Sequence, residues 1–165
     1  MAVYTKIDKS DIKLINTNFK IEKIISFQGI KQGIENTNYL LKSKDKKFIL
    51  TIFEKRVSNK EIPFFMKLMD KLNSSKINCP KPLRTKSDSY LIKLKKKTAC
   101  IVSFLEGKDK KKLNIKDCYA IGKTTAQMHL VTEKLKLYRK NSMGIKNLNS
   151  LFKSIKFKDY KFSKI

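Results

Sequence analysis

Apolar and polar positions in the first third of the chain follow the pattern of short strands separated by turns. A β-rich apolar run occupies Lys20–Phe27, and residues 28–36 form a polar loop with two glycines. Thr37–Lys42 and Phe48–Phe53 lie on either side of a charged turn at residues 43–46, which is typical of a β-hairpin. The chain is therefore expected to open with a three-stranded meander.

One strong helical pattern follows the meander. Apolar residues spaced three and four apart predict a helix over about 62–73, and Ser58–Glu61 has the form of a capping box. Two further β-rich runs, Ser89–Lys95 and Thr98–Phe104, surround a lysine turn. Three strands, one helix and two strands do not alternate as parallel βαβ units do. The order predicts an α+β fold with a five-stranded antiparallel sheet and one main helix.

Helical signals also flank this unit. Asp8 is placed to cap a short helix, with Asp11 in the first turn. Asn114 is placed to cap a longer helix with an apolar face. Beyond Thr132 the apolar residues follow no clean period.

The chain is strongly basic, which raises the question of a nucleic-acid partner. Its 165 residues carry 39 basic and 14 acidic side chains, for a net charge of +25, and three of the basic residues are arginine. Surfaces that bind phosphates usually use arginine, whereas lysine, isoleucine and asparagine all have AT-rich codons. We therefore interpret the charge as compositional and expect no specific nucleic-acid partner. A small basic nucleic-acid-binding protein is the alternative, without an RNP-type strand, zinc knuckle or helix-turn-helix to support it.

Cysteine, histidine and the apolar runs exclude several classes of protein. Cys79, Cys100 and Cys118 are widely spaced, so free buried thiols are expected rather than disulfides or a zinc cluster. His129 is the single histidine, which excludes a histidine-rich metal site. No apolar run approaches the roughly 20 residues of a membrane span, and the N-terminus lacks a secretory pattern. We expect a cytoplasmic protein that does not bind membranes.

The glycine-bearing loop is the first candidate for chemistry. Gly29 and Gly33 lie between two predicted strands, where backbone N–H groups can approach nucleotide phosphates. The spacing is neither a Walker A loop nor G-x-G-x-x-G, and a purely structural hairpin loop is the alternative. In series, however, the elements have the layout of a kinase-like small lobe, in which ATP lies beneath the loop and a linker contacts adenine.

Several segments carry a family resemblance. They are SFQGIKQGIENTNYLL at Ser26–Leu41, FILTIFEKRV at Phe48–Val57, and the segments Ile62–Leu72, Cys79–Pro82, Ile101–Gly107 and Ile121–Leu130. Together they resemble the homoserine kinases of the aminoglycoside phosphotransferase and choline kinase-like group. The resemblance runs in order over nearly the whole chain and is clearest between residues 20 and 130.

The resemblance implies ATP-dependent phosphorylation of the L-homoserine hydroxyl, a step of threonine biosynthesis, with Mg²⁺ as a second cofactor. It implies a protein-kinase-like small lobe that binds ATP over residues 1–103, a hinge at 104–108 and the beginning of an α-helical large lobe at 109–165. Gly29 and Gly33 would cover the phosphates. Backbone groups of Ser103 and Leu105 would face adenine.

This sequence departs from the family pattern at two places that bear on the phosphates. Thr51 occupies the strand position that carries a phosphate-binding lysine in many relatives. Lys55 and Arg56, next along the chain, are candidates to replace it. The alternative is that both cations are simply solvated at an exposed strand end. Glu61 is the candidate for the helix glutamate that pairs with such a lysine.

The catalytic elements of the family are missing from the sequence. The family uses Asp in an H-x-D-x-x-x-x-N loop and a later Asp that holds Mg²⁺, but Val131 stands two residues after His129. No catalytic or metal-binding residue is therefore assigned in this chain, which resembles the first part of a longer enzyme and is expected to be inactive alone. Within the same fold, a choline-, sugar- or aminoglycoside-like alcohol is the alternative acceptor.

Overall fold

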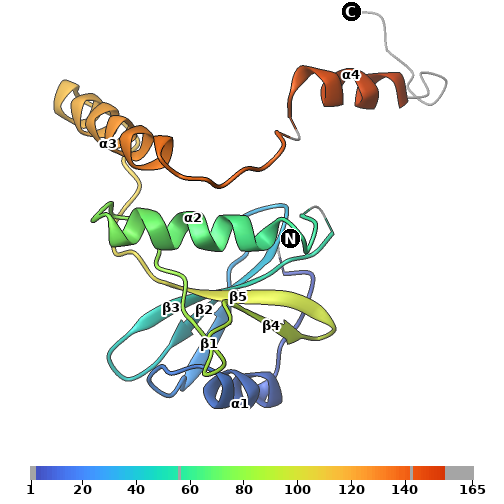
Figure 1. Ribbon diagram of the computed structural model, residues 1–165. Helices are drawn as coiled ribbons and strands as arrows, with labels where there is room; N and C mark the ends of the chain where they lie inside the picture. The colour runs from blue at the N-terminus through green and yellow to red at the C-terminus, as the bar shows by residue number, and fades with distance from the viewer. Residues whose placement is uncertain (1–2, 56, 142, 155–165) are drawn as a thin grey trace, which may run out of the picture.

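The computed structural model describes residues 3–55, 57–141 and 143–154. Five strands form one sheet: β1 Ser26–Gly29, β2 Thr37–Lys42, β3 Lys47–Ile52, β4 Leu91–Leu94 and β5 Lys97–Ser103. Their order across the sheet is β1-β2-β3-β5-β4, and every neighbouring pair is antiparallel (Figure 1). The predicted five-stranded antiparallel sheet is confirmed.

The first strand begins later than its apolar run predicts. β1 begins at Ser26 and extends into the segment expected to be loop. Before it, Asn16 holds the backbone, because its Oδ1 accepts a hydrogen bond from Ile24 N at 2.8 Å and its Nδ2 donates to Ile24 O at 3.2 Å. Ile24 is buried in the core. The start predicted at Lys20 is therefore wrong, because the backbone of Ile24 bonds to the Asn16 side chain and not to a neighbouring strand.

The main core lies between one face of the sheet and α1, Lys9–Asn18, and we call this side the α1 face. Asp8 is the N-cap, as predicted, and forms a capping box with Asp11: Asp8 Oδ1 accepts from Asp11 N at 3.3 Å, and Asp11 Oδ2 accepts from Asp8 N at 2.9 Å. The buried residues of this core are Ile7, Ile12, Ile15, Phe19, Ile24, Tyr39, Leu41, Phe48, Leu50, Ile52, Leu94, Ala99 and Ile101.

The opposite side of the sheet, which we call the α2 face, is covered by α2, Ile62–Ser74 (Figure 1). Ile62 and Met66 pack against Cys100 of β5 in a second, smaller core. The helix itself is where the apolar spacing predicts it. Because α1 and α2 lie on opposite faces, the sheet is the middle layer of the domain.

The capping box predicted at Ser58–Glu61 does not form. Glu61 is the N-cap of α2 and makes no side-chain capping bond. Ser58 instead belongs to a tight turn, in which its carbonyl accepts from Glu61 N at 2.9 Å and its hydroxyl accepts from Lys60 N at 3.3 Å. The turn places Ser58 too early to cap the helix, so the pattern was misleading there.

The β4–β5 turn uses two lysines where glycine is usual. Lys95 and Lys96 have φ values of 49° and 63°, the left-handed region that a two-residue hairpin turn of this kind requires. Lys95 Nζ pairs with Asp8 at 2.7 Å and with Asp11 at 3.1 Å. These ion pairs connect the turn to the start of α1.

Two helices follow the residues predicted as a hinge. α3, Ile115–Glu133, has the predicted Asn114 capping box with Asp117. α4, Ile145–Ser154, is a helix that the irregular pattern after Thr132 did not define. Neither helix has a buried residue, and Figure 1 shows α3 near one end of α2 and α4 separated from the sheet domain. No helix in the described ranges is both long and apolar enough to cross a bilayer.

The predicted burial of three free cysteines is correct for one of them. All three thiols are free, but Cys100 is buried, Cys79 is half-buried and Cys118 is exposed. Cys118 lies on α3, none of whose residues is buried. The prediction for Cys118 is wrong because a helical apolar period does not guarantee a partner surface.

Candidate functional site

The α2 face of the sheet is only partly covered, and the part that stays open is apolar. Leu40 lies opposite Ile49, and Ile49 lies opposite Val102, on β2, β3 and β5. Directly opposed residues in antiparallel strands point to the same face, and all three are half-buried. We call this row the apolar platform.

A cleft of about 330 Å³ continues this surface beneath α2. It is lined by Thr51, Phe53, Phe65, Met66, Leu68, Met69, Leu72, Pro80, Cys100 and Val102. Thr51, the hydroxyl among these side chains, donates its Oγ1 hydrogen to Asn38 Oδ1 at 2.8 Å. Burial raises the pKa of the Cys100 thiol to about 12, so this thiol is not a nucleophile near neutral pH.

The backbone N–H groups at the start of the segment predicted to be a hinge differ in whether they are already hydrogen-bonded. Ser103 N–H donates to the Lys81 carbonyl at 2.9 Å. Phe104 N–H donates to the Lys47 carbonyl at 3.2 Å. Leu105 comes next, and its N–H makes no hydrogen bond within the described residues. The Ser103 N–H is thus bound to Lys81 and the Leu105 N–H has no partner in the described part of the chain, while the contact of both backbones with adenine stays a prediction.

The first hinge residues are tied to the start of β3. Lys47 Nζ pairs with Glu106 Oε1 at 2.8 Å and lies 5.2 Å from the centroid of the Phe104 ring. These contacts hold the backbone around Leu105 beside the sheet. Leu105 follows three residues after Val102, the member of the apolar platform on β5.

The β1–β2 loop, residues 30–36, lies at the opposite end of the sheet from the hinge. Gly33 has a φ of 104°, a conformation that side chains disfavour. Gly29 ends β1, and a Cβ on it would come within 2.9 Å of Val3 Cγ2. Gly33 is thus required by the shape of the loop, and Gly29 by the close packing of the N-terminal segment.

Lys55 lies just after β3, near this loop. It is exposed and lines a second cleft of about 440 Å³. The other residues that line this cleft are Tyr4, Ile34, Glu35, Glu54 and Lys97. Arg56, the alternative to Lys55, lies outside the described residues.

Glu61 is engaged elsewhere. Its Oε1 pairs with Arg139 Nε at 2.9 Å, and the Arg139 guanidinium lies 5.0 Å from the centroid of the Phe65 ring. In the part of the chain that the structure describes, Glu61 and Lys55 form no ion pair. The structure thus connects Glu61 to the segment after α3 and does not bring the two predicted residues together.

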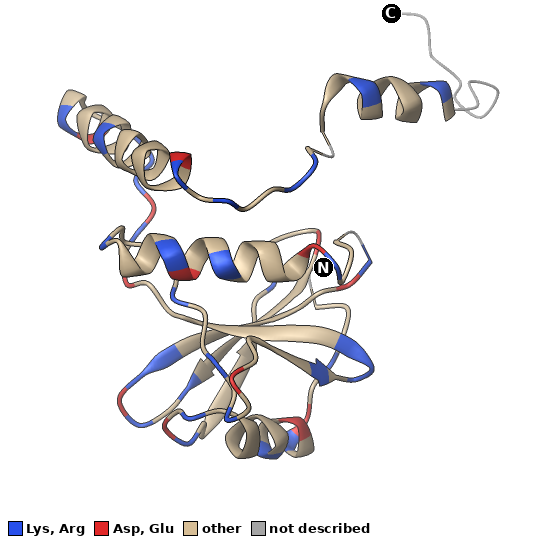
Figure 2. Cartoon of the chain, viewed as in Figure 1, with Lys and Arg blue, Asp and Glu red and all other residues tan. Residues whose placement is uncertain are grey.

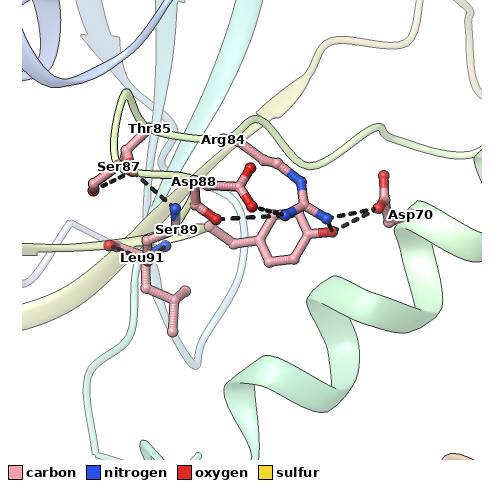
Figure 3. Close-up of polar contacts among 8 residues, drawn as sticks. Asp70, Arg84, Thr85, Ser87, Asp88, Ser89 and Leu91 are labelled. Carbon is pink, nitrogen blue, oxygen red and sulfur yellow. Dashed lines mark hydrogen bonds and ion pairs between the residues drawn. The ribbon is translucent and has the colours of Figure 1, made fainter.

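A polar cluster that the sequence did not reveal connects α2 to the segment that precedes β4 (Figure 3). The Arg84 guanidinium lies 4.2 Å from the centroid of the Tyr90 ring and pairs with Asp88 at 2.9 Å and with Asp70 of α2 at 3.4 Å. Tyr90 Oη donates to Asp70 Oδ2 at 2.5 Å. The cluster keeps α2 at a fixed position over the sheet, and so helps to define the cleft beneath it.

Charge and metal-binding groups are dispersed. Lysine and arginine occur on elements throughout the chain (Figure 2). No group of three or more His, Cys, Asp or Glu side chains within the described ranges is placed to hold a metal ion. His129 is exposed on α3.

Known proteins similar to this chain are phosphotransferases. Residues 26–149 match the phosphotransferase enzyme family. A homoserine kinase of Methylocella silvestris is 36% identical over 158 residues, which are 96% of this chain and 49% of that protein. One of Bartonella tribocorum is 39% identical over 145 residues, which are 88% of this chain and 46% of that protein. The chain thus spans about half the length of these curated relatives and corresponds to their N-terminal portion.

Solved structures agree on the fold. Spectinomycin phosphotransferase in complex with ADP and spectinomycin superposes with a TM-score of 0.66 at 17% identity, over 98% of this chain and 50% of that one. A microcompartment-associated aminopropanol kinase superposes with a TM-score of 0.64 at 13% identity, over 85% and 47% of the two chains. The sheet and its helices therefore have the protein-kinase-like fold of these enzymes. With the match over residues 26–149, the chain belongs to the phosphotransferase enzyme family.

Proposed function

We propose that this chain is the nucleotide-binding part of a homoserine kinase, which uses ATP to phosphorylate the side-chain hydroxyl of L-homoserine in threonine biosynthesis. The observation that carries the proposal is the 36% and 39% identity to homoserine kinases over nearly the whole chain. In the proposal, residues 1–103 are the ATP-binding lobe, residues 104–108 are the hinge and residues 109–165 begin a second, helical lobe. Because ATP and amino-acid precursors are cytoplasmic, the proposed location is the cytoplasm.

The adenine ring is proposed to lie on the apolar platform, with the Leu105 N–H as its hydrogen-bond donor. The half-buried row of Leu40, Ile49 and Val102 beside a free backbone N–H supports this placement. Ligand sites commonly combine an apolar surface with a few placed polar groups. The residues present therefore fit a nucleotide.

The phosphates are proposed to lie toward the β1–β2 loop, with Lys55 as the nearby cation. Gly33, with its positive φ, gives the loop a backbone that can turn N–H groups toward an anion. Mg²⁺ would neutralise phosphate charge in such a reaction. We assign its ligands to no described residue, because no acidic group there has the required arrangement.

The nucleotide part of the proposal is tested with the ¹⁵N-labelled chain and ADP. We expect chemical shift changes at Leu40, Ile49, Val102 and Leu105. Leu105→Pro removes the backbone N–H and should weaken ADP binding by about tenfold, whereas the matched variant Leu105→Ala keeps the N–H and should bind normally. Equal binding by both variants would overturn the hinge contact, and the absence of shifts on the platform would overturn the site.

The acceptor is tested by ADP formation. The chain alone is expected to give no homoserine-dependent ADP above a no-enzyme control. A fusion to the C-terminal part of the Methylocella silvestris relative should give it. Turnover with aminopropanol, choline or spectinomycin, but not homoserine, would show a different alcohol acceptor. Tight DNA binding with a steep salt dependence, and no response to ADP, would favour a nucleic-acid-binding protein instead.

A further inference from the structure

We propose that the N-terminal segment, residues 3–7, holds the β1–β2 loop in its nucleotide-binding shape from the α1 face of the sheet. The inference rests on the proposed nucleotide site and adds to it a set of residues that act by positioning the loop. The segment lies ahead of α1, and Val3 packs against the main core. It contacts the loop at its middle and at both of its ends.

The middle of the loop is held by a tyrosine hydroxyl. Tyr4 Oη donates to the Ile34 carbonyl at 3.1 Å. The Ile34 side chain is 84% exposed, so burial of this side chain does not fix the loop. The hydrogen bond from Tyr4 instead attaches the backbone one residue after Gly33.

Both ends of the loop are also held. At the end of β1, Val3 Cγ2 lies so close to Gly29 that a Cβ would meet it at 2.9 Å. At the start of β2, the Thr37 hydroxyl accepts from the N–H groups of Tyr4 at 3.0 Å and Thr5 at 3.1 Å. The loop is therefore attached to consecutive residues of one segment.

The segment is itself anchored in the sheet. Tyr39 Oη donates to the Thr5 carbonyl at 3.0 Å and accepts from Ile7 N at 3.2 Å. Thr5 Oγ1 donates to Glu54 Oε1 at 2.7 Å and accepts from Lys97 Nζ at 2.8 Å. Because β2, the end of β3 and β5 all contribute, the segment is a firm support for the loop.

An ordered loop matters for affinity. If only a fraction of molecules has the binding shape, the apparent dissociation constant rises by the inverse of that fraction. Loss of one hydrogen bond typically changes such an equilibrium by about 3- to 10-fold. Tyr4 is the residue whose hydroxyl can be removed with the least change elsewhere, because its side chain is mainly exposed.

The test compares Tyr4→Phe with the matched control Tyr119→Phe, which removes an exposed hydroxyl on α3. Backbone ¹⁵N order parameters of residues 31–35 should be about 0.85 in the unaltered chain and below about 0.6 in Tyr4→Phe. The dissociation constant for ADP, from the NMR titration, should rise in Tyr4→Phe, by at most the about 3- to 10-fold change in the loop equilibrium, and stay unchanged in Tyr119→Phe.

Each other outcome has a distinct meaning. Unchanged order parameters in Tyr4→Phe would show that the segment does not hold the loop, and the inference would be wrong. A mobile loop with unchanged ADP affinity would show that the held shape is not needed for binding, which also overturns it. If the unaltered chain gives no ADP-dependent shifts, the proposed nucleotide site fails, and with it the inferred role in binding; the order parameters then decide separately whether the segment holds the loop.

Discussion

Glu54→Gln removes the charge of a carboxylate that is nearly enclosed by its donors. Glu54 Oε1 accepts from the hydroxyls of Thr5 and Thr37 at 2.7 and 2.6 Å, and Oε2 pairs with Lys97 Nζ. The Glu54 side chain is 10% exposed and that of Lys97 is 38% exposed. Burial acts to raise the pKa of Glu54, but hydrogen bonds from Lys97, Thr37 and Thr5 outweigh it, so the pKa lies below its ordinary value of 4.5.

The expected loss in the free energy of unfolding is about 2 kcal/mol. Breaking a fully buried ion pair costs about 3–5 kcal/mol, but Lys97 can turn toward water and the new amide keeps one acceptor oxygen.

The pH dependence has a definite sign. Because folding lowers the pKa of Glu54, its contribution is present above pH 4.5 and is lost as the pH falls through the folded-state value.

Urea unfolding of the unaltered chain and of Glu54→Gln, at pH 7 and at intervals down to pH 3, measures both effects. The difference between the two proteins should be about 2 kcal/mol at pH 7 and should shrink below pH 4.5. Glu106→Gln is the matched control, since Glu106 also pairs with a lysine but its side chain is 74% exposed; it should change stability by less than about 0.5 kcal/mol. Equal losses in the two variants would refute the reasoning.

Three further predictions concern the turn, the core and the thiols. Lys96→Gly should raise the free energy of unfolding by about 0.5–1 kcal/mol, since φ is 63° there; a decrease in urea unfolding would contradict this. Ile101→Ala, in the main core, should cost about 2–5 kcal/mol, while Ile121→Ala, 53% exposed on α3, should change stability by less than about 0.5 kcal/mol; similar losses would show that α3 is packed in solution. Iodoacetamide at pH 8 should modify exposed Cys118 within minutes and leave buried Cys100 intact until the chain unfolds, as followed by peptide mass spectrometry.

Features that depend on neighbours in the chain could be predicted from the residues. The hairpin of Thr37–Lys42 and Phe48–Phe53, and the caps at Asp8 and Asn114, involve groups a few positions apart. Their geometry follows from backbone sterics and local hydrogen bonds, so the pattern of residues is sufficient. Gly33 belongs to the same class, because its positive φ is a property of one turn.

Side-chain partners across the fold could not be predicted in this way. Glu61 forms an ion pair with Arg139, although a lysine was the expected partner of Glu61. Ser58 lies in the turn before α2 and therefore does not cap the helix. In each case a second group competes for the predicted partner, and only the three-dimensional arrangement decides which one is near enough.

The sequence by itself determined the order of the strands and the main helix along the chain and the glycine-bearing loop, because helical spacing and turn residues are encoded residue by residue. The tertiary structure decided what supports that loop. Thr5, Thr37, Glu54 and Lys97 come from four separate parts of the chain. They meet because the antiparallel order β1-β2-β3-β5-β4 brings the start of β2, the end of β3 and the start of β5 to one end of the sheet. These residues are far apart in the sequence, so no local pattern predicts that they are neighbours.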